Sequence, residues 1–133
     1  MSFIEFTGRA RLGKRTKNLV SRLGPGDVAI IDHQDIDRVS AEELLESGVR
    51  VVVNVAQSQS GRFPNPGPLL LVHGGVRLID APGAPLFDEL SDGEDVTVRG
   101  ASLFRNGTCL ANGRSLVAEE LHRDDALDQA APH

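Results

Sequence analysis

The feature that most constrains the fold is a run of valines near the middle of the chain. Residues 49–56, VRVVVNVA, hold five valines that do not alternate with polar residues. A strand with one solvated face alternates, whereas a strand covered on both faces is continuously apolar. The run therefore predicts a central strand of a parallel sheet with packing on both faces.

The segments around this run alternate between strand and helix patterns. Further strands are predicted over residues 3–11, 28–32, 76–80 and 95–99. A first helix over residues 16–23 ends at a Gly-Pro-Gly stop. A second contains the capping box of Ser40 with Glu43 and ends at Gly48, with an earlier start near Asp35 as the alternative. A third helix over residues 66–73 has Asn65 as its N-cap. This order predicts an α/β fold with some parallel strands.

The last third of the chain has a different pattern. Asn106-Gly107 is a preferred two-residue turn and predicts a β-hairpin in a second, mostly antiparallel layer. We therefore expect a compact α/β domain with a mixed sheet and a C-terminal β-hairpin over residues 1–117. Residues 118–133 are expected to fray or to form a linker toward a part of the protein that is absent here.

Composition narrows the class of protein. With 133 residues, 40% hydrophobic and 25% charged, the chain resembles an ordinary globular domain. Its five aromatic residues are all Phe, so the core must consist of Val, Leu, Ile and Ala. A single cysteine, Cys109, excludes an internal disulfide and a cysteine metal cluster. No apolar run has the length of a membrane span and no secretory signal is visible, so a cytoplasmic location is expected.

The positive charge is concentrated at the N-terminus. Six of the fourteen Lys and Arg residues lie within the first 22 positions, where Glu5 is the single acid. Such a segment can attract phosphate, nucleic acid or an acidic protein surface. The alternative is a solvated helix face that pairs with the acidic remainder of the chain. We expect no nucleic-acid partner, because the sequence has few of the aromatic side chains on which single-stranded bases stack.

The loop SQSGRFPNPGP, residues 58–68, follows the valine strand and precedes a helix. Ligands of α/β sheets bind at this edge, and helix N-termini favour anions. We predict an anion-binding loop formed by Asn54, Ser58, Ser60, Gly61, Arg62 and Asn65. The alternative is a rigid connector, in which Arg62 pairs with an internal acid and Asn65 is only a cap.

A second polar group follows the strand over residues 28–32. Asp32 and His33, with Asp35 and Asp37 nearby, could hold Mg²⁺ or act as acid and base. Their spacing fits no calcium or zinc pattern, and the alternative is helix capping. We predict Asp32 and His33 beside the anion loop, without a metal or cofactor. Since no nucleophile has an adjacent base, the isolated domain is not expected to be an enzyme.

Several of these pieces together resemble a known family. They are Gly26-Asp27, IDHQDIDRV at residues 31–39, Asn54, and SGRFPNPGP at residues 60–68. The combination resembles the N-terminal region of SteA-type proteins, actinobacterial proteins of the cytokinetic ring, over most of residues 8–110. The resemblance implies a longer protein with a thiamin pyrophosphokinase-like domain and a membrane-spanning segment, both absent here, that anchors it at the division site.

The resemblance leaves two classes of function open. The first is a non-catalytic regulatory or interaction domain in septation, whose partners would be the other domains of the full-length protein, a division-site protein and a phosphorylated small molecule. The second is an accessory substrate-binding domain of a thiamin pyrophosphokinase-like enzyme. The order of elements also resembles the swivelling domains of phosphoenolpyruvate-dependent phosphotransfer enzymes. Those carry a phosphorylated histidine in the corresponding loop, whereas residues 58–67 hold none and the nearest is His73.

Overall fold

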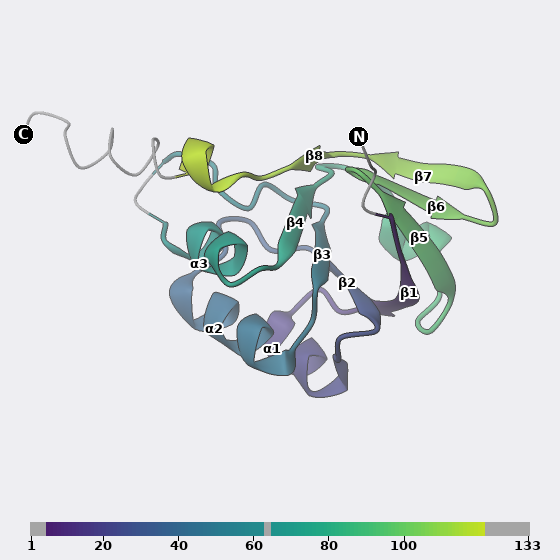
Figure 1. Cartoon of the computed structure of the whole chain (residues 1–133), viewed down its shortest axis with the longest axis horizontal. Helices are drawn as coiled ribbons and strands as arrows, with labels where there is room; N and C mark the ends of the chain where they lie inside the picture. The colour runs from purple at the N-terminus through teal and green to yellow at the C-terminus, as the bar shows by residue number, and fades with distance from the viewer. Residues whose placement is uncertain (1–4, 63–64, 122–133) are drawn as a thin grey trace, which may run out of the picture.

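Four parallel strands form the centre of the computed structural model, which describes residues 5–62 and 65–121 (Figure 1). They are β1 (Glu5–Leu12), β2 (Asp27–Ile31), β3 (Val51–Asn54) and β4 (Arg77–Asp80), side by side in chain order. All residues of β2 and β3 are buried, and Val28 pairs with Val51. The prediction of a parallel strand covered on both faces is therefore confirmed for the valine run.

Antiparallel strands extend both edges of this parallel centre. On the β1 side follow β5 (Asp95–Arg99), β6 (Ser102–Arg105) and β7 (Thr108–Asn112), while the short β8 (Arg114–Ser115) pairs with β4. The result is one eight-stranded mixed sheet, so the expected separate antiparallel layer is wrong. The reason is that β1 keeps a free edge, and β5 pairs with it along its length from Glu5 to Arg9.

The chain reverses between β6 and β7 at the Asn106-Gly107 pair. The two residues have φ angles of 51° and 81°, as the two central positions of a tight hairpin turn require. β6 and β7 pair antiparallel on either side of it, with a register irregularity near Phe104.

Helices cover one face of the parallel strands (Figure 1). They are α1 (Thr16–Leu19), a 3₁₀ turn (Val20–Arg22), α2 (Arg38–Ser47) and α3 (Gly67–His73). Their apolar side chains and the facing side of the sheet form one core, which includes Leu19, Ile31, Leu44, Val52, Leu71 and Leu78.

The opposite face of the sheet forms a second core. It joins β1–β4 to the antiparallel strands and to the short α4 (Leu86–Glu89), and includes Ile30, Val53, Ile79, Leu86, Val98 and Leu103. Since alternate residues of β2 and β3 enter the two cores, the sheet is a layer shared between them.

The predicted helix ends are only partly correct. Gly48, with a φ of 81°, ends α2 as expected. The capping box is wrong, because Asp37 occupies the N-cap position of α2 and Ser40 lies inside the helix. Asn65 is not the N-cap of α3, a position that Pro66 takes. The first helix is also shorter than predicted, since it becomes a 3₁₀ turn after Leu19.

The end of the described chain packs against the helical core. Leu116 and Leu121 are both buried, and Leu121 belongs to a helical turn that begins at residue 118. Most of the predicted tail, from residue 122 onward, lies outside the described residues, as do residues 3–4 of the first predicted strand. Within the described ranges, no helix combines the length and the apolar character that crossing a bilayer requires.

Candidate functional site

The carboxyl ends of β1–β4 meet at one edge of the sheet, because the four strands are parallel. Three loops leave this edge toward the helical face, at residues 13–15, 32–37 and 55–66. Ligands of open α/β sheets bind outside the carboxyl ends of the strands. All the predicted site residues lie in the second and third of these loops or, in the case of Asn54, at the end of β3.

Asn54 holds two of the loops together. It is fully buried, and its side-chain amide donates to the carbonyl of His33 and to Ser58 Oγ, both at 2.9 Å. Its Oδ1 accepts from the backbone N–H groups of His33 and Ala56, both at 3.0 Å. Every hydrogen-bonding position of the amide group is therefore used inside the protein.

Ser58 is also fully buried, and it connects the third loop to β4. Its N–H donates to Asp80 Oδ2 at 2.9 Å and its hydroxyl donates to Oδ1 at 2.5 Å. Burial raises the pKa of Asp80, although the two hydrogen bonds from Ser58 and the charge of Arg114 act in the opposite direction. Asn65, which is buried too, donates to the carbonyl of Ser58 at 2.9 Å.

The next part of the loop is held by Asp35. Ser60 donates to this carboxylate through its N–H at 2.7 Å and through its hydroxyl at 2.9 Å. Gly61, with a φ of 84°, and Arg62 are exposed. Among the described residues, the Arg62 guanidinium has no hydrogen bond or ion pair.

The start of α3 is closed by neighbouring backbone. Gly67 is buried, and a Cβ at this position would overlap the carbonyl oxygen of Ile36 and approach that of Asp37 to 2.8 Å.

The residues predicted for the anion loop include a buried group of Asn54, Ser58 and Asn65 and an exposed group of Gly61 and Arg62.

Asp32 and His33 line a hollow of about 290 Å³, and the backbone of His33 also bonds Asn54 of the predicted anion group. Its other lining residues are Lys14, Arg15, Thr16, Lys17 and Gln34. His33 Nε2 lies 3.2 Å from Ser40 Oγ and 3.5 Å from a carboxylate oxygen of Asp37. The hydrogen bond from Ser40 lowers the pKa of Asp37. The imidazole is thus positioned by α2, while Asp32 is exposed.

The cations of this hollow come from the β1–α1 loop and the start of α1. Arg15 and Lys17 are exposed and form no hydrogen bond or ion pair of their side chains with another described residue. Lys14 places its Nζ 5.6 Å from the ring centre of Phe87, on α4. A ligand in the hollow can therefore contact these three cations, whereas the amides of Asn54 and Asn65 and the hydroxyl of Ser58 are buried and bonded inside the protein.

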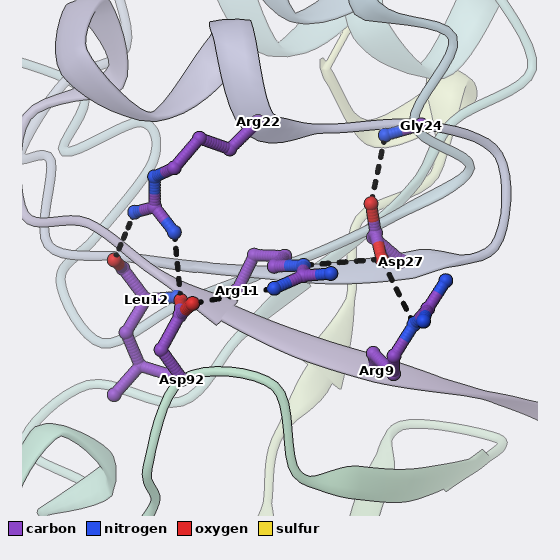
Figure 2. A network of polar contacts seen from close by, with 7 residues as sticks. All are labelled: Arg9, Arg11, Leu12, Arg22, Gly24, Asp27 and Asp92. Atoms are coloured by element: carbon purple, nitrogen blue, oxygen red, sulfur yellow. Dashed lines mark hydrogen bonds and ion pairs between the residues drawn. The ribbon is translucent and has the colours of Figure 1, made fainter.

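The other arginines of the basic segment are neutralised by the protein itself (Figure 2). Arg22 and Arg11 both converge on Asp92, at 2.9 and 3.3 Å, and Arg11 also reaches Asp27 at 3.4 Å. Arg9 lies 3.9 Å from Asp27. The alternative of pairing with the chain's own acids therefore holds for these three arginines.

Asp92 also fixes backbone at this network. Its Oδ1 accepts from the N–H of Leu12 at 2.8 Å, and Arg22 donates to the carbonyl of the same residue at 2.8 Å (Figure 2). Asp27 accepts from the N–H of Gly24 at 2.9 Å. The network thus joins the end of β1 to the loops before β2 and β5, which is a structural role.

A larger hollow, of about 440 Å³, lies at the amino ends of β3 and β4, and its lining includes Phe6, Arg50, Val76 and Arg77. Within residues 5–62 and 65–121, no group of three or more His, Cys, Asp or Glu side chains could hold a metal ion. Cys109 is exposed on β7.

Sequence reasoning did not identify Asp80 or the cations as site residues. Asp80 could have been found from its position, because it ends β4 opposite Asn54 at the end of β3. Lys14, Arg15 and Lys17 belonged to the basic segment, but their spacing gave no sign of which charges would be paired by Asp27 and Asp92.

Comparison with known proteins assigns no family. The chain matches no protein-family model, and a search of curated proteins finds no significant match. What the resemblance to SteA-type proteins implies therefore remains a hypothesis, supported by the residue runs quoted for it.

Proposed function

We propose that this chain is a non-catalytic regulatory or interaction domain of a cytoplasmic, SteA-type cell-division protein, and that it binds a small phosphorylated ligand. The site of binding would be the hollow beside Lys14, Arg15 and Lys17 at the carboxyl edge of the sheet. The partners would be the remaining domains of the full-length protein and a protein of the division site. The family part of this proposal depends on the sequence resemblance.

One observation carries the ligand part. Arg9, Arg11 and Arg22 of the basic segment are paired with Asp27 and Asp92, whereas the three cations of the hollow have no carboxylate partner among the described residues. Basic side chains around a concavity attract phosphate groups, and the charges act without the cost of breaking an internal ion pair.

The absence of phosphotransfer is a separate part of the proposal. We propose the fold of the phosphohistidine swivelling domains without their chemistry, because their loop histidine has no counterpart in residues 58–67. His33 contacts Ser40 and Asp37, and Ser40 is a buried residue of α2 that also accepts a hydrogen bond from Thr16. The Ser40 hydroxyl is thus engaged by Thr16 and His33 in a buried position, which fits a structural role better than that of a nucleophile.

The test is a titration with inorganic pyrophosphate, followed by amide chemical shifts in NMR at low ionic strength. Shifts confined to residues 13–17 and 32–34 are expected, with a dissociation constant in the millimolar to high micromolar range, since a few exposed charges give weak affinity. The triple variant Lys14→Ala, Arg15→Ala, Lys17→Ala should lose the shifts. Arg38→Ala, which removes an exposed arginine of α2, is the matched control.

Arg62→Ala separates this hollow from the predicted anion loop. Binding that survives Arg62→Ala but not the triple variant supports the hollow. Binding with the opposite dependence would assign the ligand to residues 58–67 instead. The absence of any binding to the folded protein would contradict the ligand part of the proposal.

The second candidate function is an accessory substrate-binding domain of a thiamin pyrophosphokinase-like enzyme. The exposed Arg62 favours it, because this role requires an accessible arginine on the third loop. It predicts that, in the full-length protein, Arg62→Ala raises the KM of the neighbouring domain for its phosphorylated substrate. If Arg62→Ala leaves the KM unchanged, this second candidate function is excluded and only the interaction-domain proposal remains.

A further inference from the structure

The two sides of the hollow come from adjacent strands. Leu12 of β1 pairs with Ile30 of β2, and the N–H of Gly13 donates to the carbonyl of Ile30 at 3.1 Å. The chain continues from these positions into residues 14–17 on one side and 32–34 on the other, and both segments line the same space. The side contributed by β1 is cationic, and the side contributed by β2 carries Asp32.

These opposite charges do not neutralise each other. Asp32 forms no ion pair with Lys14, Arg15 or Lys17, although all four side chains line one hollow of about 290 Å³. Nearby arginines show the contrast, because Arg11 and Arg22 close directly onto Asp92. The positive and negative side chains of the hollow are therefore not joined by an ion pair.

A purely anionic ligand is not the best occupant of such a space. Phosphate oxygens placed beside the cations would also be repelled by Asp32, since charges interact over several ångströms at a protein surface. An ammonium group on the same ligand would turn that repulsion into attraction. The volume is at the lower end of ligand-binding pockets, so the ligand must be small.

We infer that the hollow selects a small phosphate monoester that carries a primary ammonium group. The phosphate lies against Lys14, Arg15 and Lys17, and the ammonium lies against Asp32. This inference rests on the proposed phosphate-binding function and adds the class of ligand to it.

The test compares phosphoethanolamine with ethyl phosphate, which has the same phosphate but no amine. NMR titrations at neutral pH and low salt should give wild-type protein an affinity for phosphoethanolamine about 1.5-fold to 5-fold higher than for ethyl phosphate, the range of one surface charge pair. Asp32→Asn should remove this preference, weakening phosphoethanolamine and strengthening ethyl phosphate. Glu46→Gln, which removes an exposed carboxylate near the far end of α2, should leave both affinities unchanged.

The opposite signs of the two Asp32→Asn effects distinguish a direct contact from loss of structure, which would weaken both ligands. Equal affinity of wild-type protein for both esters, or a preference that persists in Asp32→Asn, would overturn the inference while leaving phosphate binding in place. If pyrophosphate and both esters fail to bind, the proposed function itself fails.

Phosphoethanolamine also forms the headgroup of phosphatidylethanolamine, where the phosphate is a diester with a single negative charge, and a vesicle assay separates this lipid from the free monoester. Cosedimentation with vesicles of phosphatidylethanolamine and phosphatidylcholine, but not of phosphatidylcholine alone, would show that the lipid diester is bound and would overturn the assignment to a monoester. Binding to free phosphoethanolamine without cosedimentation would assign it to a soluble ester.

Discussion

Asn54→Ala should destabilise the protein more than most single substitutions, because the side chain closes four hydrogen bonds at the centre of the candidate site. The change deprives the N–H and carbonyl of His33 and the N–H of Ala56 of their partner, while Ser58 keeps its bond to Asp80. A buried polar group left without a partner costs about 1–3 kcal/mol. His33 and Ala56 are only partly buried, so water can reach them and the lower value applies.

Three such groups at about 1 kcal/mol each, with about 1 kcal/mol more for the cavity, give a loss of about 4 kcal/mol in the free energy of unfolding. A domain of this size has about 5–15 kcal/mol to lose, so the variant should still fold. Urea denaturation followed by circular dichroism measures the difference directly.

Two further variants make the result interpretable. Asn112→Ala removes an exposed asparagine that bonds Ser102, and should change stability by no more than about 0.5 kcal/mol. Asn54→Asp keeps both acceptor bonds, loses both donors and buries a charge near Asp80, so its defect should be greatest at neutral pH and smaller in acid. A loss below about 1 kcal/mol for Asn54→Ala, with an unchanged denaturant slope, would show that the loops are held by other contacts.

Three more predictions concern the surroundings of the site. Gly67→Ala should lower stability by about 1–3 kcal/mol, because the new Cβ overlaps the carbonyl of Ile36; an unchanged melting temperature would contradict that contact. Burial raises the pKa of Asp92, but hydrogen bonds led by that from Arg22 outweigh it and hold the pKa low, so the stabilisation by this carboxylate should disappear as the pH falls through that lowered value. Asp92→Asn should cost less than about 1 kcal/mol at neutral pH and low salt, and a stability difference between wild type and Asp92→Asn that does not shrink in acid would refute this. Burial raises the pKa of Asp80, so its protonated form stabilises the fold below the ordinary carboxyl pKa, and this contribution is lost as the pH rises through the raised value. Denaturation of both proteins between about pH 3 and 7 should show that the free energy of unfolding of Asp80→Asn increases relative to that of wild type as the pH rises. A difference between the two free energies that stays constant, or that changes in the opposite direction, would refute this.

Local patterns in the sequence were sufficient for the main elements of the fold. The valine run required burial on both faces, which only the centre of a covered sheet provides. The strand Asp95–Arg99 was predicted with the observed bounds, because its alternation and flanking turns are contained in a few residues. Gly48 ends α2 through its own left-handed backbone, which also depends on no distant partner.

The misses depend on residues that are far apart in the chain. Ser40 has the spacing of a capping box, but its hydroxyl lies near Thr16, 24 positions earlier, and near His33. Asn65 would suit an N-cap, yet its amide binds the carbonyl of Ser58 across the loop. A short polar side chain can satisfy several neighbours equally well, so local spacing does not decide among them.

The candidate site has the same limit. Sequence spacing indicated which loops reach the carboxyl edge, but not which of their side chains are buried in it. The separation of the basic segment into paired arginines and accessible cations is set by Asp27 and Asp92, and Asp92 comes close to Arg11 only because β5 folds back beside β1.

The position of β1 in the sheet affects how the chain can fold during its synthesis on the ribosome. β1 precedes the other described strands in the chain, yet one of its edges is completed only when β5 arrives, and Glu5 then meets Arg99 across 94 positions. The outer edge of β4 likewise waits for β8. A nascent chain ending near Leu90 would hold the four parallel strands with both outer edges open, and open edges recruit strands from other chains. Release before residue 115 should therefore yield aggregates, and shielding of the growing chain by chaperones should matter most until β5 and β8 have been synthesised.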